Sequence, residues 1–313
     1  MASAPASIGN VGIGFDVLGL AFDAARDSVT AIREAKPGVR LGAVSGLVQR
    51  LPGEVARNTA LAAAEALLAS ARPGFGVRLD IEKGIPVSAG MGGSAASAVA
   101  AVVAVNALLP EPLAHGALLP FALEGERASA DPPPWDNVMA SLLGGLVIAA
   151  REEPDAVVGL PVPHGIETIL FHPAAEVETG AARKLLAPHV PMRIAVEHSR
   201  RIAAFVAGCV GNDPSLIRLG FEDLLVEPQR LHLMPTLSAA QAAASAAGAL
   251  GCAFSGSGPS VFAWALSADA DAVEAAIAEA FRDSDLSARS YRAPANSAGA
   301  RIEQPFAPRV VAA

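Results

Sequence analysis

The sequence predicts a two-domain protein of the α/β class, and three observations carry that prediction. A length of 313 residues exceeds one typical domain and suits two domains of about 150 residues each. Segments with the alternation of a strand and segments with helical composition follow one another along the chain. A polar break, REEP at 151–154, divides the series near its middle. We therefore expect domains at 1–150 and 151–313.

In the first half, the elements are predicted from periodicity and composition. Period-two alternation indicates strands, and Ala-rich segments without Gly or Pro indicate helices. A loop rich in glycine at 84–93 separates the last of these strands from a long apolar helix. The expected elements are strands at 39–47, 76–81 and 142–150, and helices at 58–70 and 94–109.

The second half repeats the alternation of strands and helices. The lengths of its strand segments and helical segments suit a small α/β sandwich. The expected strands are 167–171, 193–196, 252–255 and 260–265, and the expected helices are 181–186, 199–209, 237–249 and 270–281.

The composition excludes several other classes of protein. The chain has 23 Lys and Arg against 31 Asp and Glu, a net charge of -8, which argues against a nucleic-acid partner because such proteins concentrate positive charge. The most apolar stretch, 94–109, is dominated by alanine and too short to cross a membrane, and no signal-peptide pattern opens the chain. Cys209 and Cys252 form no metal or disulfide pattern. We expect a cytoplasmic protein that binds no membrane.

Three glycine-rich segments, 5–23, 86–97 and 255–260, are the candidates for chemistry. Taken singly, each could be an ordinary turn. The second lies between a predicted strand and a predicted helix, where glycines and a helix N-terminus favour an anion such as phosphate. Lys83, just before it, is either a solvated strand end or a contact to a bound nucleotide.

Other catalytic patterns are missing from the sequence. No Gly-Lys-Ser/Thr of a Walker loop occurs. Residues 83–89 separate a nominal G-x-G-x-x-A from the strand before it, whereas a dinucleotide fingerprint follows its strand directly. The histidines lack zinc spacing and no serine has the G-x-S-x-G elbow. Phosphate binding with acidic residues nearby, notably Glu126 and Asp136, favours Mg-nucleotide chemistry.

Several motifs in a fixed order then resemble one family. The second segment contains the pattern P-x-x-x-G-M-G-x-S-A, and the third lies within a glycine motif, GCAFSGSGPSVF at 251–262. NVGIGFDVLG at 10–19 is the most discriminating, and D-N-V at 136–138, the Gly pair at 144–145, T-x-x-x-R at 179–183 and E-P-x-R at 227–230 follow. Together they resemble the GHMP small-molecule kinases, in the branch that acts on homoserine, over nearly the whole chain.

The resemblance implies a fold and an activity. It implies an N-terminal domain like domain 2 of ribosomal protein S5 and a ferredoxin-like C-terminal domain, with the active site between them. The implied reaction is phosphorylation of the side-chain hydroxyl of L-homoserine by ATP and Mg²⁺, in threonine biosynthesis. A homodimer is expected by the same analogy.

The resemblance also implies roles for single residues. Asp16 would pair the ammonium of homoserine, and two arginines its carboxylate. Asn137 would orient the hydroxyl and Thr179 lie near the transferred phosphoryl, with Asp136 as general base the less favoured alternative. The implied substrate residues are Asn10, Asp16, Asn137, Arg183 and Arg230. Those implied for ATP are Asn58, Lys83, Pro86, Gly90, Met91, Gly92, Gly93, Ser94, Ala95 and Ala96, and those for Mg²⁺ are Ser94 and Glu126.

Two departures from the family pattern leave alternatives open. Gly93 stands where the family usually has serine, and Pro134-Trp135 stands where it commonly has His-x before Asp-Asn. The neighbouring Glu124 competes with Glu126 as the metal ligand. The alternatives are a GHMP kinase for another small hydroxylated metabolite, and a nucleotide-binding sensor of the same fold.

Overall fold

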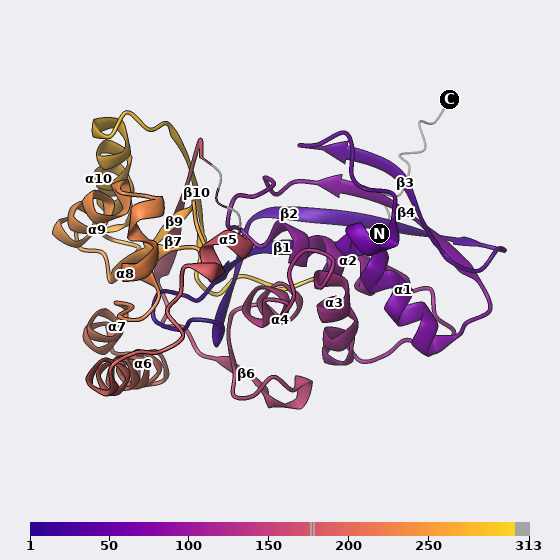
Figure 1. The fold of residues 1–313 in the computed structure, drawn as a ribbon, viewed down its shortest axis with the longest axis horizontal. Coiled ribbons are helices and arrows are strands. Elements are labelled where there is room, and N and C mark those ends of the chain that lie inside the picture. Colours follow the sequence, from indigo (N-terminus) through magenta and orange to yellow (C-terminus); the bar gives the residue numbers. More distant parts are fainter. Residues whose placement is uncertain (176, 178, 304–313) are drawn as a thin grey trace, which may run out of the picture.

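Two β-sheets, each covered by helices, make up the chain in the computed structural model, which describes residues 1–175, 177 and 179–303 (Figure 1). The first sheet has the order β11-β1-β2-β4-β3, with β5 pairing β2 and β6. Its pairings are antiparallel apart from β3 with β4. The strands are β1 Ala2–Gly9, β2 Leu18–Glu34, β3 Val39–Gly46, β4 Gly76–Lys83, β5 Leu146–Ala149, β6 Val157–Leu160 and β11 Arg301–Ile302.

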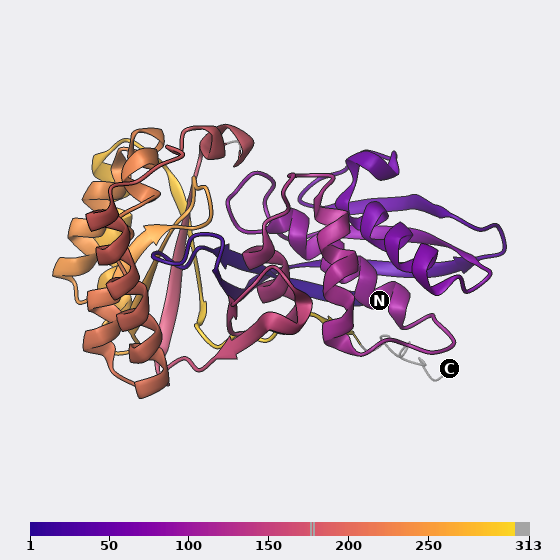
Figure 2. The ribbon, with the colours of Figure 1, turned by 60° about the horizontal axis from the view of Figure 1, so that its bottom comes forward.

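Helices cover one face of the first sheet, where α2 and α4 contact β1 and β2 and α3 packs against α1 and α2 (Figure 2). The central one, α2, is buried along its whole length from Ala95 to Asn106, as expected for a helix that is apolar all round. The Asn58 side chain caps the N-terminus of α1 by accepting from two backbone N–H groups of that helix. The helices are α1 Thr59–Ala71, α2 Gly93–Asn106, α3 Leu119–Glu126 and α4 Trp135–Leu143.

The second sheet is antiparallel, with the order β10-β7-β9-β8. Alternate residues of β9 enter different cores: Phe262 and Trp264 join the core of the first sheet, while Val261 and Ala263 pack with α9 and α10. The strands are β7 Ile166–Pro173, β8 Gly251–Phe254, β9 Val261–Leu266 and β10 Ala288–Pro294. The helices are α5 Thr179–Lys184, α6 Met192–Gly211, α7 Pro214–Gly220, α8 Glu227–Arg230, α9 Thr236–Ala246 and α10 Ala270–Asp283.

The predicted fold class is confirmed, and two predicted strands are corrected. Residues 193–196 lie inside α6, because a four-residue segment with three apolar residues does not separate strand from helix and the amphipathic pattern of the longer segment prevails. Residues 142–143 end α4, and only Leu146–Ala149 within the predicted strand 142–150 is extended. Four strands of the first sheet, β1, β2, β6 and β11, and β10 of the second sheet lie outside the predicted strands. The domain division at residue 150 stays a prediction.

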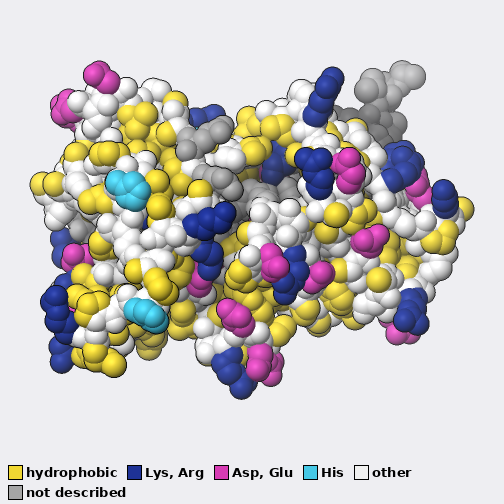
Figure 3. Space-filling view, viewed as in Figure 1, with side chains coloured by type: hydrophobic (Ala, Val, Ile, Leu, Met, Phe, Trp, Pro, Cys, Tyr) yellow, Lys and Arg dark blue, Asp and Glu magenta, His cyan; other side chains and the backbone are white. Residues whose placement is uncertain are grey.

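One face of the molecule and the two cysteines bear on the classes of partner considered from the sequence. On the face shown in Figure 3, basic and acidic side chains are interspersed and gather in no single-sign patch. Cys209 and Cys252 are both free thiols. Among the described residues, no helix combines the length and the apolar character that a membrane span requires.

Candidate active site

The three glycine-rich segments meet in space where the two sheets adjoin. The hydroxyl of Ser255 donates to the carbonyl of Gly90 over 2.6 Å, which joins the third segment to the second. The backbone N–H of Gly256 donates to the carbonyl of Gly9 over 3.1 Å, which joins the third segment to the first. Segments that are far apart in sequence, by 165 residues for Gly90 and Ser255, therefore form one structure.

Two glycines of the second segment are required by its geometry. Gly90 and Gly92 have φ of +70° and +64°, a region that other residues rarely adopt. A Cβ on Gly92 would lie 2.0 Å from the hydroxyl oxygen of Ser7, and one on Gly90 would lie 2.6 Å from the carbonyl oxygen of Gly258. These two positions therefore require glycine, because a side chain at either one would collide with a neighbouring segment.

A cavity of about 780 Å³ opens beside this loop. Its lining contains most residues expected to hold ATP, and Ala95 and Ala96 instead lie behind the loop, fully buried in α2. The lining includes Asn58, Lys83, Pro86, Gly90, Met91, Gly92, Gly93, Ser94, Glu126, Asn137 and Arg183.

Ser94 and Glu126 form a pair of oxygen donors at this cavity. The Ser94 hydroxyl donates to Glu126 Oε1 over 2.6 Å, and Glu126 Oε2 has no hydrogen-bond partner in the described part of the chain. Burial raises the pKa of Glu126 to about 7, and the bond from Ser94 opposes that rise. A hydroxyl and an unsatisfied carboxylate oxygen suit a hard cation such as Mg²⁺. Glu124 instead pairs with Arg127 at the surface.

Ser94 and Glu126 are the two side chains expected to hold a metal ion at this cavity. Within the described residues, no group of three or more His, Cys, Asp or Glu side chains is placed to hold a metal ion. A cation at Ser94 and Glu126 would therefore need further ligands from phosphate oxygens and water, which is the usual arrangement for Mg²⁺ in nucleotide sites.

Asp136 and Asn137 lie in the first turn of α4 and face the first segment. Asp136 accepts from the backbone N–H of Asn10 over 2.9 Å and from that of Asn137 over 2.8 Å. Burial, followed by the charge of Asp16, raises the pKa of Asp136 to about 6. The Asn137 side-chain oxygen accepts from the Ser7 hydroxyl over 3.0 Å. Asp136 therefore holds the amide of Asn137 and the backbone of Asn10 in place.

The residues expected to bind the two ends of homoserine form a cluster around Phe15. Asp16 accepts from Arg183 through two bonds of 2.8 Å. The guanidinium groups of Arg183 and Arg230 each lie 5.5 Å from the centre of the Phe15 ring. Sequence reasoning missed Phe15, although it directly precedes Asp16 in the first motif.

Arg230 is the more buried of the two arginines. Only 3% of it is exposed, and its guanidinium donates to the carbonyls of Ala182 and Gly256 over 3.3 and 3.5 Å. Burial and then the charge of Arg183 lower its pKa. Within the described residues Arg230 forms no ion pair, so its charge is available to an anionic ligand.

The first segment has a left-handed backbone at two of these residues. Asn10 and Asp16 have φ of +68° and +56°, a left-handed conformation that Asn and Asp adopt more readily than other residues with a side chain. Asn10 stabilises this conformation, since its side-chain oxygen accepts from the Asp16 N–H and its amide nitrogen donates to Gly256 O.

Three further predicted residues lie in different settings. Asn58 caps α1 and also donates to the carbonyl of Pro52 over 2.8 Å. The Lys83 ammonium bonds to Asp27, Ser97 and the Gly93 carbonyl. Thr179 begins α5, and its side chain lies outside what the structure describes.

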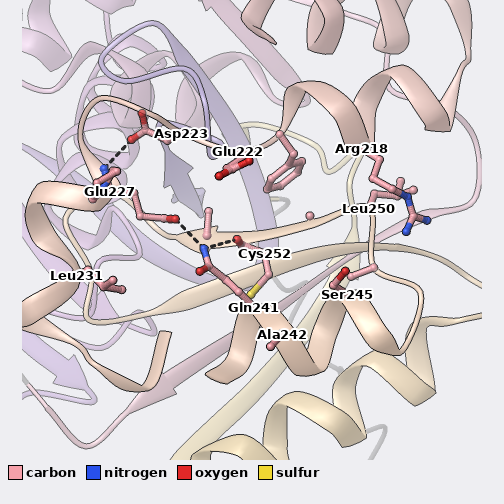
Figure 4. Close-up of a pocket in the computed structure, with 15 residues that line it drawn as sticks. Arg218, Glu222, Asp223, Glu227, Leu231, Gln241, Ala242, Ser245, Leu250 and Cys252 are labelled. Atoms are coloured by element: carbon pink, nitrogen blue, oxygen red, sulfur yellow. Dashed lines mark hydrogen bonds between the residues drawn. The ribbon is translucent and has the colours of Figure 1, made fainter. Parts of the chain in front are cut away.

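A second cavity of about 480 Å³ lies beside β8 and contains none of the predicted site residues (Figure 4). Glu227, which begins the short helix that ends at Arg230, faces it and accepts from Gln241 over 2.6 Å. Gln241 also donates to the Cys252 carbonyl over 3.1 Å. Burial raises the pKa of Glu227 to about 7, against the hydrogen bond from Gln241.

Comparison with known proteins identifies the class. The GHMP kinases N-terminal domain matches residues 58–145 and the GHMP kinases C-terminal domain matches 203–283. The fold and the glycine-lined site thus have the GHMP kinase pattern, and the chain belongs to this family.

The relatives of the chain belong to the homoserine kinase branch of this family. The chain is 42% identical to the homoserine kinase of Xylella fastidiosa strain M12, over 96% of this chain and 93% of that one. It is 35% identical to the homoserine kinase of Chlorobium phaeobacteroides, over 96% and 98%. The crystal structure of homoserine kinase from Cytophaga hutchinsonii superposes with a TM-score of 0.91 at 37% identity, over 96% of both chains.

Proposed function

We propose that this protein is an enzyme that transfers the γ-phosphoryl group of ATP to the side-chain hydroxyl of L-homoserine, in threonine biosynthesis. The observation that carries the proposal is the cluster of Asp16, Arg183 and buried Arg230 around Phe15, next to the glycine loop. A carboxylate and two guanidinium groups match the ammonium and carboxylate of an amino acid. The relatives are homoserine kinases over almost the whole chain.

Binding of homoserine, which is a zwitterion, would replace the ion pair between Asp16 and Arg183 with ion pairs to the ligand. Asp16 and Arg183 pair with each other through two 2.8 Å bonds. A bound amino acid would insert its carboxylate between Arg183 and Arg230 and present its ammonium to Asp16. Each of the three charges then keeps a partner, so that the desolvation cost of the cluster is offset.

The phosphoryl step needs positioning and neutralised charge, because its transition state is loose. Asn137 orients the substrate hydroxyl, and Asp136 holds Asn137 through two hydrogen bonds of 2.8 and 3.2 Å. Since both Asp136 oxygens already accept bonds, we favour this positioning role over general base. Thr179, near the transferred phosphoryl, is a further proposed participant.

The glycine loop and the N-terminus of α2 would receive the phosphates through backbone N–H groups. Ser94 and Glu126 would hold Mg²⁺, which when bound neutralises phosphate charge during transfer. The buried, unpartnered Oε2 of Glu126 supports this assignment. A Ser94→Ala variant should therefore lose turnover and need more Mg²⁺ for half-maximal rate, and unchanged Mg²⁺ dependence would place the cation elsewhere.

A coupled assay of ADP release across a panel of amino alcohols tests the substrate. We expect homoserine to give the highest kcat/KM. Turnover with another hydroxylated metabolite and none with homoserine would support the first alternative. Binding of Mg-ATP without substrate-dependent ADP release would support a sensor. The homodimer and the cytoplasmic location expected from the sequence stay predictions.

A further inference from the structure

A buried ion pair that the proposed chemistry does not use lies beneath the glycine loop. Lys83, the last residue of β4, is 4% exposed, and Asp27 on β2 is fully buried. The Lys83 ammonium donates to Asp27 Oδ2, and over 2.9 Å each to the Ser97 hydroxyl and the Gly93 carbonyl. An ammonium has three N–H donors, and all three are engaged.

Asp27 bonds to the other end of the same loop. Its Oδ1 accepts from the backbone N–H groups of Gly84 and Ile85 over 3.0 and 3.1 Å. Its Oδ2 accepts from the Ser97 hydroxyl over 2.6 Å, in addition to Lys83. The pair therefore holds the first two residues of the loop through Asp27 and the residue that begins α2, Gly93, through Lys83.

We propose that Asp27 and Lys83, with Ser97, are positioning residues that fix both ends of the phosphate-binding loop, and that Lys83 affects ATP only through this loop. The Lys83 charge is already matched by Asp27 and its donors are used, so neither is free for a phosphate. A buried ion pair adds little net stability over apolar residues of similar size. What apolar residues cannot supply here is the set of hydrogen bonds to Gly84, Ile85 and Gly93.

The inference rests on the proposed function, because it assumes that loop 84–93 holds ATP. The test therefore measures ATP binding directly, by calorimetry with Mg-ATP on the full chain without homoserine. Absence of homoserine phosphorylation would contradict the proposed function and leave this measurement interpretable. The variants are Asp27→Asn, Lys83→Met and the double variant Asp27→Leu/Lys83→Met, with Asp23→Asn on the same strand as the matched control.

We expect both single variants to weaken ATP binding by similar factors of roughly 10- to 100-fold, the size of effect that follows the loss of a buried hydrogen-bond partner. The KM for homoserine should change far less than the KM for ATP. The double variant leaves no unpaired buried charge, so its Tm should return toward that of the wild type while ATP affinity stays low. Asp23→Asn should bind ATP as the wild type does.

Two results would overturn the proposal. Loss of ATP affinity in Lys83→Met that greatly exceeds the loss in Asp27→Asn, with both variants folded, would indicate a direct contact between Lys83 and the nucleotide. Recovery of both Tm and ATP affinity in the double variant would show that the pair only stabilises the fold. Should the single variants fail to fold, the double variant still tests the second outcome, because recovery of ATP affinity in it would overturn the proposal.

Discussion

At the scale of single residues, the site concentrates ionisable groups in environments that alter their pKa. Burial raises the pKa of Glu126 to about 7 and that of Asp136 to about 6. Arg230 is buried with its charge unpaired by any described residue, which lowers its pKa. Perturbed groups of this kind cluster at functional sites. Here they surround the place where an amino acid and phosphates would meet.

Arg230→Ala tests the substrate cluster. Truncating one partner of a buried charge pair costs about 2–5 kcal/mol, so kcat/KM for homoserine should fall by about 30-fold or more. The KM for ATP should stay near its original value, because the Arg230 side chain contacts Phe15, Ala182 and Gly256 rather than the glycine loop. Steady-state kinetics with each substrate varied in turn measure this split.

The exposed Arg218→Ala provides the control for that variant, since it removes the same type of side chain outside the site. It should leave both KM values unchanged. Equal effects of Arg230→Ala on the two substrates would contradict the assignment of Arg230 to the carboxylate.

Glu227 predicts a pH dependence of stability. Its pKa is raised from the ordinary 4.5 to about 7 in the folded chain, so the folded state binds the proton more tightly than the unfolded state. The protonated Glu227 therefore adds about 3 kcal/mol to the free energy of unfolding below pH 4.5, and this stabilisation is lost as the pH rises through 7. Glu227→Gln should therefore gain stability relative to the wild type between pH 5 and pH 8.

Urea unfolding of both proteins at pH 5 and pH 8 measures that gain. The comparison isolates Glu227 because Glu126 and Asp136 contribute the same pH dependence to both chains. Parallel pH profiles for the two proteins would contradict the assignment of a raised pKa to Glu227.

At the scale of elements, the glycine loop and the helix that follows it form one unit. α2 is buried all round, which fixes its N-terminus, and the loop in front of it has two glycines at positive φ. Both elements could be predicted from the sequence, because an Ala-Val run and clustered glycines are local signals. The strand predicted at 193–196 is wrong because four residues are too few to define a period.

Gly92→Ala tests the loop. A left-handed backbone costs a residue with a Cβ about 1–2 kcal/mol, and the new Cβ would lie 2.0 Å from Ser7 Oγ. We expect a lower Tm and a severe loss of ATP binding by calorimetry. Gly53→Ala, whose Cβ would meet no atom within 4 Å, is the matched control and should keep both properties. Normal ATP affinity in Gly92→Ala would show that the loop does not hold the nucleotide.

Other parts of the site depend on tertiary structure and could not be predicted from the sequence. Asp27 reaches Lys83 because β2 and β4 pair with Ser28 opposite Glu82, a register that no local pattern specifies. Phe15 gains its role only when Arg183 and Arg230, from distant helices, lie against its ring. The motif order could suggest that these segments belong together, but not which atoms meet.

At the scale of the whole molecule, both halves of the chain build the site. Asp16 of the first half pairs with Arg183 of the second, and Gly256 accepts from Asn10 and from Arg230. The chain carries a net charge of -8, so anionic ATP is attracted by local groups rather than by the overall field. The local groups that we propose are the backbone N–H groups of the loop and a cation that Ser94 and Glu126 would hold.

The central claim is that this molecule phosphorylates homoserine on its side-chain oxygen. The most direct measurement is ³¹P NMR of a reaction that contains the purified chain, Mg-ATP and L-homoserine, with ADP quantified in parallel. We predict one phosphate monoester signal, that of O-phospho-L-homoserine, formed in equal amount to ADP and absent when homoserine is omitted. ADP that forms at the same rate without homoserine, with no phosphate monoester, would contradict the claim.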